Sequence, residues 1–307
     1  MTGTDLPAGQ EPCAAGIVIF NPEPAALIVL LQAAMAEAST ILLFQNSNLP
    51  SAVEQFLATG ATCPVVRLGD GTNAGLGAAY NQFLKWAHTN GFNHIALFDQ
   101  DSLPSPGMLG KLLAKMQRLA EQGCNPAVLG PSVVDSNGVA FARPPLRNPG
   151  GNPLPSDCLP LDFIISSGSM IDVTAFAQIG PFRSDFFIDF IDVEWCARAN
   201  ALGYSCWMSP ATPMTHRLGS GVVRLPFIPL ALTRQPPARA YTFIRNQIAL
   251  LRLAHVPLRQ KLRTAARLVL HTAFAPLIAQ SPATTLQLML LGWRHGIQGR
   301  LGPPPPN

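Results

Sequence analysis

Short apolar segments alternate with longer amphipathic ones as far as residue 135, and this alternation constrains the fold more than any other feature. The apolar segments predict strands over 16–20, 40–48, 63–68, 94–98 and 127–134, and the periodic ones predict helices over 22–38, 51–60, 75–91 and 105–123. Continuous apolar strands separated by helices are typical of βαβ units. We therefore expect an α/β fold whose central, mostly parallel sheet is covered on both faces.

Polar side chains follow several of these strands. Asn21 follows the first, Gln45 and Asn46 end the second, and Asp99 and Asp101 follow the fourth. Ligands of parallel sheets bind beyond the carboxyl ends of the strands, where such side chains would meet. The sequence thus predicts a binding site at this edge of the sheet.

The helix predicted over 51–60 carries a recognisable start signal. Ser51 and Glu54 have the spacing of a capping box, in which the serine hydroxyl and the glutamate each accept a backbone N–H. We expect Ser51 to be the N-cap.

Asp99 and Asp101 stand two positions apart in "HIALFDQDSLP". Side chains at i and i+2 of a strand point to the same side, and carboxylate oxygens suit Mg²⁺ or Mn²⁺. Aspartates also cap helices and form turns, so the pair alone leaves both interpretations open.

A second acidic group strengthens the metal interpretation. Asp185, Asp189, Asp192 and Glu194 lie among aromatic side chains, and the last two begin a predicted helix that ends near Gly203. The helix dipole explains part of this placement, whereas apolar surroundings would raise a carboxyl pKa as a general base requires. His216 follows a predicted strand and is either structural or a further metal ligand.

The composition bounds the organisation of the chain. It has 307 residues, is 48% hydrophobic and only 12% charged, so a large core is expected. We predict a flexible leader over 1–12, a main domain over 13–235 containing a Pro/Gly-rich loop at 142–157, a helical segment over 236–301 and a disordered tail over 302–307. Six cysteines without a zinc-site spacing predict free thiols and a cytoplasmic protein.

Basic residues gather late in the chain, although the net charge is only +4. This asymmetry indicates contact with membrane headgroups or phosphorylated substrates, or a solvated helical face. The segment "LRQKLRTAARLVLHTAFAPLIA" mixes basic and apolar residues at helical spacing, which fits an in-plane membrane helix, a dimerising helix or one that covers the main domain. No apolar run is long enough to span a bilayer, and no signal peptide or nucleic-acid partner is predicted.

Several motifs together resemble family 2 glycosyltransferases, most closely the bacterial rhamnosyltransferases that build O-antigen and related polysaccharides. They span about residues 15–300 and comprise "VIFNPE", "FQNSN", "TNAGLGAAYNQFLKWA", "LFDQDSLPSP", "DFIISSGSMI", "IGPFRSDFFIDFIDVEWCARANALGY", "MTHRLG" and "RAYTFIRNQIAL". The resemblance implies a GT-A fold with a C-terminal helical extension, an Mg²⁺ or Mn²⁺ ion, and inverting transfer from a nucleotide sugar. It favours dTDP-L-rhamnose as donor and a saccharide or lipid-linked acceptor, which implies contact with the inner face of the cell membrane.

The resemblance also implies residue roles. Asp99, Asp101 and His216 would hold the metal, Asp192 would be the base, and Glu194 would orient the site; Ile191 departs from the family pattern, so Asp189 and Glu194 stay alternatives for the base. Gln45 stands where the family usually has Asp, which puts base choice or donor affinity in question. The run Ser166–Ser169 is a turn or the floor of the sugar or acceptor pocket, and Arg245 with Asn246 contacts phosphate or caps the domain. The implied donor-binding residues are Phe20, Asn21, Gln45, Asn46, Asn73, Gly75, Asn81, Asp99, Ser167 and Gly168.

Three other functions compete with the rhamnosyltransferase interpretation. A family 2 transferase using UDP-glucose, UDP-galactose or a similar donor keeps every role. A haloacid-dehalogenase-like phosphatase also places Asp-x-Asp after a strand, but its nucleophile lies early in the chain and a small residue follows the pair, whereas Leu103-Pro104 follows here. An inactive transferase scaffold rests on Gln45 alone.

Overall fold

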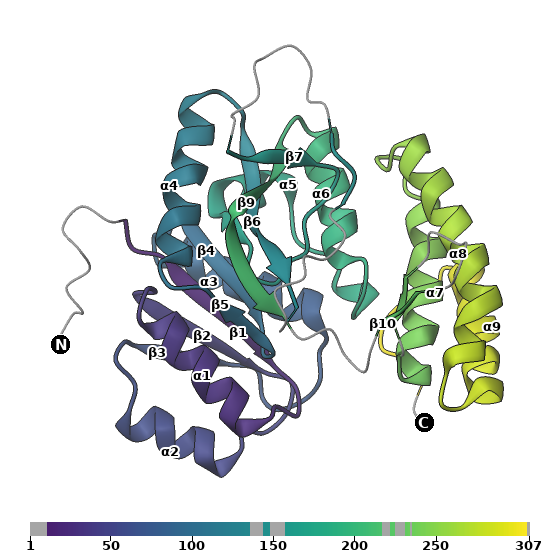
Figure 1. The fold of residues 1–307 in the computed structure, drawn as a ribbon, viewed down its shortest axis with the longest axis horizontal. Helices are drawn as coiled ribbons and strands as arrows, with labels where there is room; N and C mark the ends of the chain where they lie inside the picture. The colour runs from purple at the N-terminus through teal and green to yellow at the C-terminus, as the bar shows by residue number, and fades with distance from the viewer. Residues whose placement is uncertain are drawn as a thin grey trace.

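The computed structural model describes residues 11–135, 144–147, 157–216, 222–224, 231–233 and 235–305. A twisted sheet with helices on both faces forms the larger part, and the helices α7, α8 and α9 lie together at one side of it (Figure 1). The mixed α/β architecture and the C-terminal helical region both confirm the prediction. Most of the predicted leader and of the loop at 142–157 lies outside the described residues, as do residues 306 and 307.

The main sheet has the strand order β3-β2-β1-β4-β8-β6-β9-β5, and β7 pairs with β9. Its strands are β1 Ala14–Ile19, β2 Thr40–Gln45, β3 Val65–Leu68, β4 His94–Asp99, β5 Ser102–Pro104, β6 Pro126–Val134, β7 Leu159–Leu161, β8 Met170–Asp172 and β9 Ser205–His216. A separate ribbon pairs β10 (Val222–Arg224) with β11 (Ala231–Thr233).

The first half of the sheet is parallel, as the alternation predicts. β1 pairs in parallel with both β2 and β4, and Ile19 lies opposite Gln45. Alternate residues of β1 face opposite layers: Ile17 and Ile19 pack toward α1 and α4, and Val18 packs toward α3. Both faces are buried, so these strands need continuous apolar sequence, and their polar ends emerge together at one edge.

Helices cover each face of the sheet. One layer contains α1 (Pro24–Met35), α2 (Ser51–Thr59) and α4 (Met108–Glu121), and the other contains α3 (Leu76–Thr89), α5 (Val173–Ile179) and α6 (Ile191–Ala201). A short 3₁₀ turn, η1 (Ser184–Phe186), leads toward α6. The two layers bury separate apolar clusters on either side of the strands, as expected for a sheet covered on both faces.

The predicted cap of α2 is wrong. Pro50 is the N-cap and Ser51 is the first helical residue, with no side chain accepting a hydrogen bond there. Glu54 instead forms a bidentate pair with Arg67 on β3, at 2.9 and 2.6 Å. Proline is well suited to this boundary because its fixed φ begins the helix without needing a donor.

The second half of the sheet departs from simple alternation. The short strand β8 runs antiparallel between β4 and β6, and β9 is parallel to β6 but antiparallel to β5. The sequence predicts only the start of β9, because its later residues include Pro210 and Pro213. This long strand carries the chain back to the edge where β4 ends.

The C-terminal region consists of α7 (Pro237–Leu251), α8 (Leu258–Ile278) and α9 (Pro282–Gln298). α7 packs against both other helices, and its residues Arg245 and Asn246 are fully buried. Among the described helices, none is long and apolar enough to cross a membrane. All six cysteines are unpaired.

Candidate functional site

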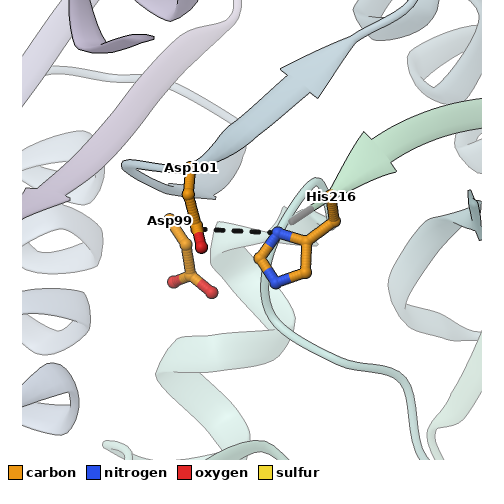
Figure 2. A group of neighbouring side chains, drawn as sticks. All are labelled: Asp99, Asp101 and His216. Carbon is orange, nitrogen blue, oxygen red and sulfur yellow. Dashed lines mark ion pairs between the residues drawn. The ribbon is translucent and has the colours of Figure 1, made fainter. Parts of the chain in front are cut away.

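The turn between β4 and β5 carries the Asp-x-Asp pair. Asp99 is the last residue of β4, and β5 begins at Ser102, which lies opposite His216 in the antiparallel pairing with β9. The backbone register therefore brings a histidine far along the chain beside the two aspartates. Figure 2 shows the three side chains turned toward one another, with His216 Nδ1 lying 3.6 Å from Asp101 Oδ1.

These three residues fit a divalent cation. One ligand atom from each lies within 4.8 Å of the others, so all three can reach a single ion. Two carboxylates and an imidazole are a suitable donor set for Mg²⁺ or Mn²⁺. Asp101 is exposed, which leaves room on the ion for a ligand from outside the protein.

Two serines support the group formed by Asp99, Asp101 and His216, which is called here the metal side. Ser167 Oγ accepts the backbone N–H of Asp99 at 3.0 Å and lies 2.5 Å from Ser102 Oγ, which in turn lies 2.9 Å from His216 Nδ1. Ser102 fixes the imidazole orientation, as residues around metal ligands commonly do. The sequence pattern does not single out Ser102, although its place next to Asp101 is a signal that could have done so.

Gly168 has a structural reason to be glycine. Its φ is +77°, and a Cβ there would lie 2.4 Å from the sulfur of Met214 and 2.9 Å from Pro131. The buried turn containing Ser167 and Gly168 therefore packs under the end of β4 rather than facing solvent. The sequence leaves open whether Ser166–Ser169 is a turn or a pocket floor. In the structure this segment forms a tight turn that supports the site.

Asp192 lies on the other side of the site, in the first turn of α6. Its Oδ1 accepts from the backbone N–H of Val193 at 2.8 Å, and its Oδ2 accepts from that of Ser166 at 3.3 Å. Burial raises the pKa of Asp192 to about 6, although these hydrogen bonds act in the opposite direction. Such a carboxylate is ionised near neutral pH yet basic enough to take a proton.

Tyr80 connects the two sides. Its hydroxyl lies 2.9 Å from Ser166 Oγ and donates to Asp99 Oδ1 at 3.4 Å. Burial raises the pKa of Tyr80 well above its usual value and also raises that of Asp99. Sequence reasoning misses Tyr80 because it stands on an ordinary helical face of α3.

Glu194 and Asp189 have other partners. Glu194, only 1% exposed, pairs with Arg198 at 2.8 Å and lies 2.9 Å from His255. Asp189 pairs with Arg239 at 3.1 Å and accepts from Thr242 at 3.3 Å. Of the three carboxylates weighed as the base, Asp192 is thus the one without a cationic partner among the described residues.

Four of the predicted donor-binding residues lie at the ends of β1 and β2 and in the loops beside them. Gln100 holds both backbone groups of Phe20, whose side chain is 48% exposed, at 2.7 and 2.8 Å. The backbone of Asn21 has a φ of 46° and donates to Ser47. Gln45 is half-buried, and Asn46 is buried with its Oδ1 accepting from Ala74.

The remaining three predicted donor-binding residues have structural contacts. Asn73 Oδ1 accepts from the backbone of Gly75, and a Cβ on Gly75 would lie 2.5 Å from the carbonyl oxygen of Phe187. Gly75 is therefore needed for close approach to another part of the chain. Asn81 holds both the N–H and the carbonyl of Phe182, so its amide is already engaged.

Comparison with solved structures identifies the fold class. The chain resembles S. aureus TarS, with a TM-score of 0.55 and 12% identity over 86% of this chain and 44% of the other, so it spans less than half of that protein. It also resembles GalNAc-T7 with UDP, GalNAc and Mn²⁺, with a TM-score of 0.55 and 11% identity over 98% of this chain and 60% of the other. The chain therefore has the fold of a GT-A glycosyltransferase.

Sequence comparison adds a finer likeness to the fold class. Residues 36–180 match the family model Glycosyl transferase family 2. The chain is also 26% identical over 294 residues to the dTDP-rhamnosyl transferase RfbF of Shigella flexneri, covering 93% of this chain and 95% of the relative. By sequence the chain thus resembles glycosyltransferases with a family 2 domain, as its motifs predict.

Proposed function

We propose that this protein transfers a sugar from a nucleotide-sugar donor to a saccharide or lipid-linked acceptor, with inversion at the anomeric carbon. The observation that carries this proposal is the meeting of Asp99, Asp101 and His216 with Asp192 through the Tyr80–Ser166 link. One group of residues suits a metal and the sugar diphosphate, and the other suits proton removal. Inverting transfer needs both on opposite sides of the reacting carbon.

Asp99, Asp101 and His216 would hold the Mg²⁺ or Mn²⁺. Such a cation, when bound, stabilises the negative charge that develops on a departing diphosphate. The protein itself fixes the ligands through the β5–β9 register and the Ser167–Ser102 hydrogen bonds. This arrangement supports metal dependence, and activity should disappear on chelation.

Asp192 would take the proton from the acceptor hydroxyl. The acceptor oxygen then forms its bond to the anomeric carbon as the bond from that carbon to the diphosphate oxygen breaks. The raised pKa of Asp192 suits this role, and its two backbone donors hold the carboxylate in place. We propose that Glu194, paired with Arg198 and His255, supports the helix instead.

We propose dTDP-L-rhamnose as the donor and cell-surface polysaccharide synthesis, such as that of O-antigen, as the setting. The support is the 26% identity to a dTDP-rhamnosyl transferase over nearly the whole chain. A UDP-sugar is the alternative donor, because the similar TarS structures include one in complex with UDP-GlcNAc. Phe20, Asn21 and Gln45 are the residues that we propose to contact the nucleoside, and the amide of Gln45 can pair with a pyrimidine edge.

Calorimetric titration with dTDP-rhamnose and UDP-hexoses, each with and without Mn²⁺, tests this proposal. We expect metal-dependent binding of dTDP-rhamnose that is tighter than that of any UDP-hexose. Preference for a UDP-hexose would replace the donor and keep the mechanism. Turnover of a phosphomonoester, or no binding of any nucleotide sugar, would contradict the transferase proposal.

We also propose that the protein works at the cytoplasmic face of the membrane, with its C-terminal helices on anionic lipid. Glu194 is the last acidic residue of the chain, so every charged side chain of α7, α8 and α9 is basic. α8 also exposes Leu258, Leu262 and Val269, which lie within 40° of one another around an ideal helix of roughly 100° per residue. An apolar strip with basic neighbours is the pattern of an in-plane helix, and the free thiols fit a reducing compartment.

Flotation with phosphatidylglycerol and with phosphatidylcholine vesicles tests the membrane contact. We expect binding to the anionic vesicles only, and its loss in a Leu262→Asn, Val269→Asn variant. The matched control is Leu202→Asn, which changes an exposed leucine at the end of α6. If the protein binds neither kind of vesicle but dimerises through this strip, the partner of the strip is a second copy of the protein.

A further inference from the structure

A strained loop forms the wall of the site next to Asp192. Residues 187–190, called here the base-side loop, include Phe187, Asp189 and Phe190 with φ values of 67°, 64° and 63°. Such values are unfavourable for residues other than glycine, and a strained segment persists only where its surroundings hold it. The base-side loop therefore needs strong external contacts.

Helix α7 supplies those contacts from buried side chains. Asn246 Nδ2 donates to the carbonyls of Phe186, Ile188 and Asp189 at 2.9, 2.7 and 3.0 Å. Arg245 Nη2 donates to the carbonyl of Phe186 at 3.1 Å, and both side chains are fully buried. These two residues therefore fasten the loop, and their side-chain donors are engaged within the protein.

Arg239 stands near the start of the same helix and reaches the same loop. Its Nε and Nη2 both donate to Asp189 Oδ1, at 3.2 and 3.1 Å. The Asp189 side chain is 7% exposed, whereas that of Arg239 is 49% exposed. Within the described part of the chain, Nη1 of Arg239 makes no hydrogen bond, so this guanidinium is anchored at one edge and open at the other.

Carboxylates of the site act electrostatically on Arg239. Its pKa is raised chiefly by Asp189, with Asp99 and Asp101 contributing in the same direction. In turn, Arg239 acts to lower the pKa of Asp99, against the larger effect of burial. Asp189, which holds the guanidinium, stands three residues before Asp192, so the open edge of Arg239 lies beside the loop that leads to the base side.

We propose that Arg239 contacts the phosphates of the donor, with Asp189 holding its guanidinium in position. The inference rests on the proposed function, since it assigns a residue to the diphosphate of the donor. The charges favour such a group: a divalent ion would offset Asp99 and Asp101, and a bound diphosphate would add negative charge beside Asp192. A planar guanidinium fixed on one edge can present its remaining N–H groups to phosphate oxygens.

The test compares nucleotides that differ only in phosphate number. Binding of dTDP and dTMP, and of UDP and UMP, is measured by calorimetry with Mn²⁺ for the wild type, Arg239→Gln and Arg239→Lys. Charged hydrogen bonds of this kind correspond to about 10- to 100-fold in affinity. We expect Arg239→Gln to lose that factor for the diphosphate and much less for the monophosphate, with Arg239→Lys in between.

Arg252→Gln is the matched control. Arg252 lies at the other end of α7 and donates to the carbonyl of Ile297 at 2.6 Å, so its loss tests general damage to the helical region. Equal weakening of mono- and diphosphates in Arg239→Gln, or unchanged binding of both, would overturn the assignment. If the wild type binds no nucleoside diphosphate with Mn²⁺, the proposed function fails together with this inference; if the wild type binds and Arg239→Gln binds equally well, only the inference fails.

Discussion

The two sides of the site are built by different means. The metal side, Asp99, Asp101 and His216, is fixed by the pairing of β5 with β9 in the sheet. The base side, Asp192 with the base-side loop, depends on side chains of α7 that come from a separate helical region. Backbone pairing positions the first, and a few buried hydrogen bonds position the second.

The C-terminal helices therefore help to build the proposed site, because side chains of α7 hold the base-side loop. Leu76 at the start of α3 holds the carbonyl of Phe187, whereas Asn246 of α7 holds the carbonyls of Ile188 and Asp189. The two sides should therefore respond differently to mutation. Damage to the metal side should affect ion binding, and damage to the base side should affect transfer.

The largest effect is expected from Asp192→Asn. Removal of a general base typically lowers the rate by about 10²- to 10⁴-fold. The amide keeps the size of the side chain, so metal-dependent donor binding should persist. Single-turnover transfer measures the rate, calorimetry measures the binding, and Asp157→Asn, a surface carboxylate paired with Lys115, is the control. Near-normal transfer would show that Asp192 is not the base.

The same residue predicts the pH dependence. Its pKa is raised to about 6 by burial, and the base works only when ionised. Transfer by the wild type should therefore increase as pH rises toward 6 and level off above it. Asp192→Asn should lose this dependence, whereas an unchanged acidic limb in that variant would assign the ionisation to another group.

Asp101→Asn should affect the metal side alone. Loss of one charged ligand should weaken Mn²⁺ binding on the order of 10- to 100-fold, because outer-shell changes already have effects of that size. Electron paramagnetic resonance of free Mn²⁺ measures the affinity. Chelation should abolish transfer by the wild type, and full activity in chelator would contradict metal dependence.

Asn246→Ala should affect the base side alone. It removes the hydrogen bonds to the carbonyls of Ile188 and Asp189, at about 1–3 kcal/mol for each group left unsatisfied, whereas the carbonyl of Phe186 keeps its bond to Arg245. We expect lower stability in urea and slower transfer, with Mn²⁺ affinity unchanged. Asn90→Ala, which removes a bond at the exposed end of α3, serves as the matched control. A parallel loss of Mn²⁺ affinity would show that the two sides are not independent.

The smallest effect is expected from Tyr80→Phe, which removes the hydroxyl that joins the two sides. The ring stays buried, so the change in stability should be about 1 kcal/mol. Combined with Asn246→Ala in a double-mutant cycle of transfer rates, it measures coupling across the link. Additive effects would mean that the hydroxyl supports the fold but does not couple the two sides energetically.

Local sequence predicts the parallel half of the fold well. Ile17, Ile41 and Ile95 lie in continuous apolar runs that only a sheet buried on both faces explains. The three-residue strands are not predictable in this way, because β5, β7 and β8 are too short to show a periodicity. The cap at Ser51 fails because Pro50 can begin a helix without a side-chain hydrogen bond.

The site shows the same division. Asp99 and Asp101 are visible because they stand two positions apart directly after an apolar run, although Asp101 lies in the turn beyond β4 and not on the strand. The meeting of Asp101 with His216 depends on the register of β5 against β9, and the roles of Asn246 and Arg239 depend on the position of a distant helix. Tyr80 and Ser102 are ordinary residues whose importance comes only from their neighbours. Long-range contacts of this kind leave no periodic trace in the sequence.

Gly302 has a practical consequence for handling this enzyme. Its N–H donates to the carbonyl of Asp185 at 2.7 Å, and its own carbonyl accepts from Arg245 at 2.6 Å. A purification tag, fluorophore or immobilisation linker joined directly after this glycine would pull on Asp185 and Arg245, the two residues that bracket Phe186 at the start of the base-side loop. Attachment near β3, at the far edge of the sheet, would leave these contacts undisturbed.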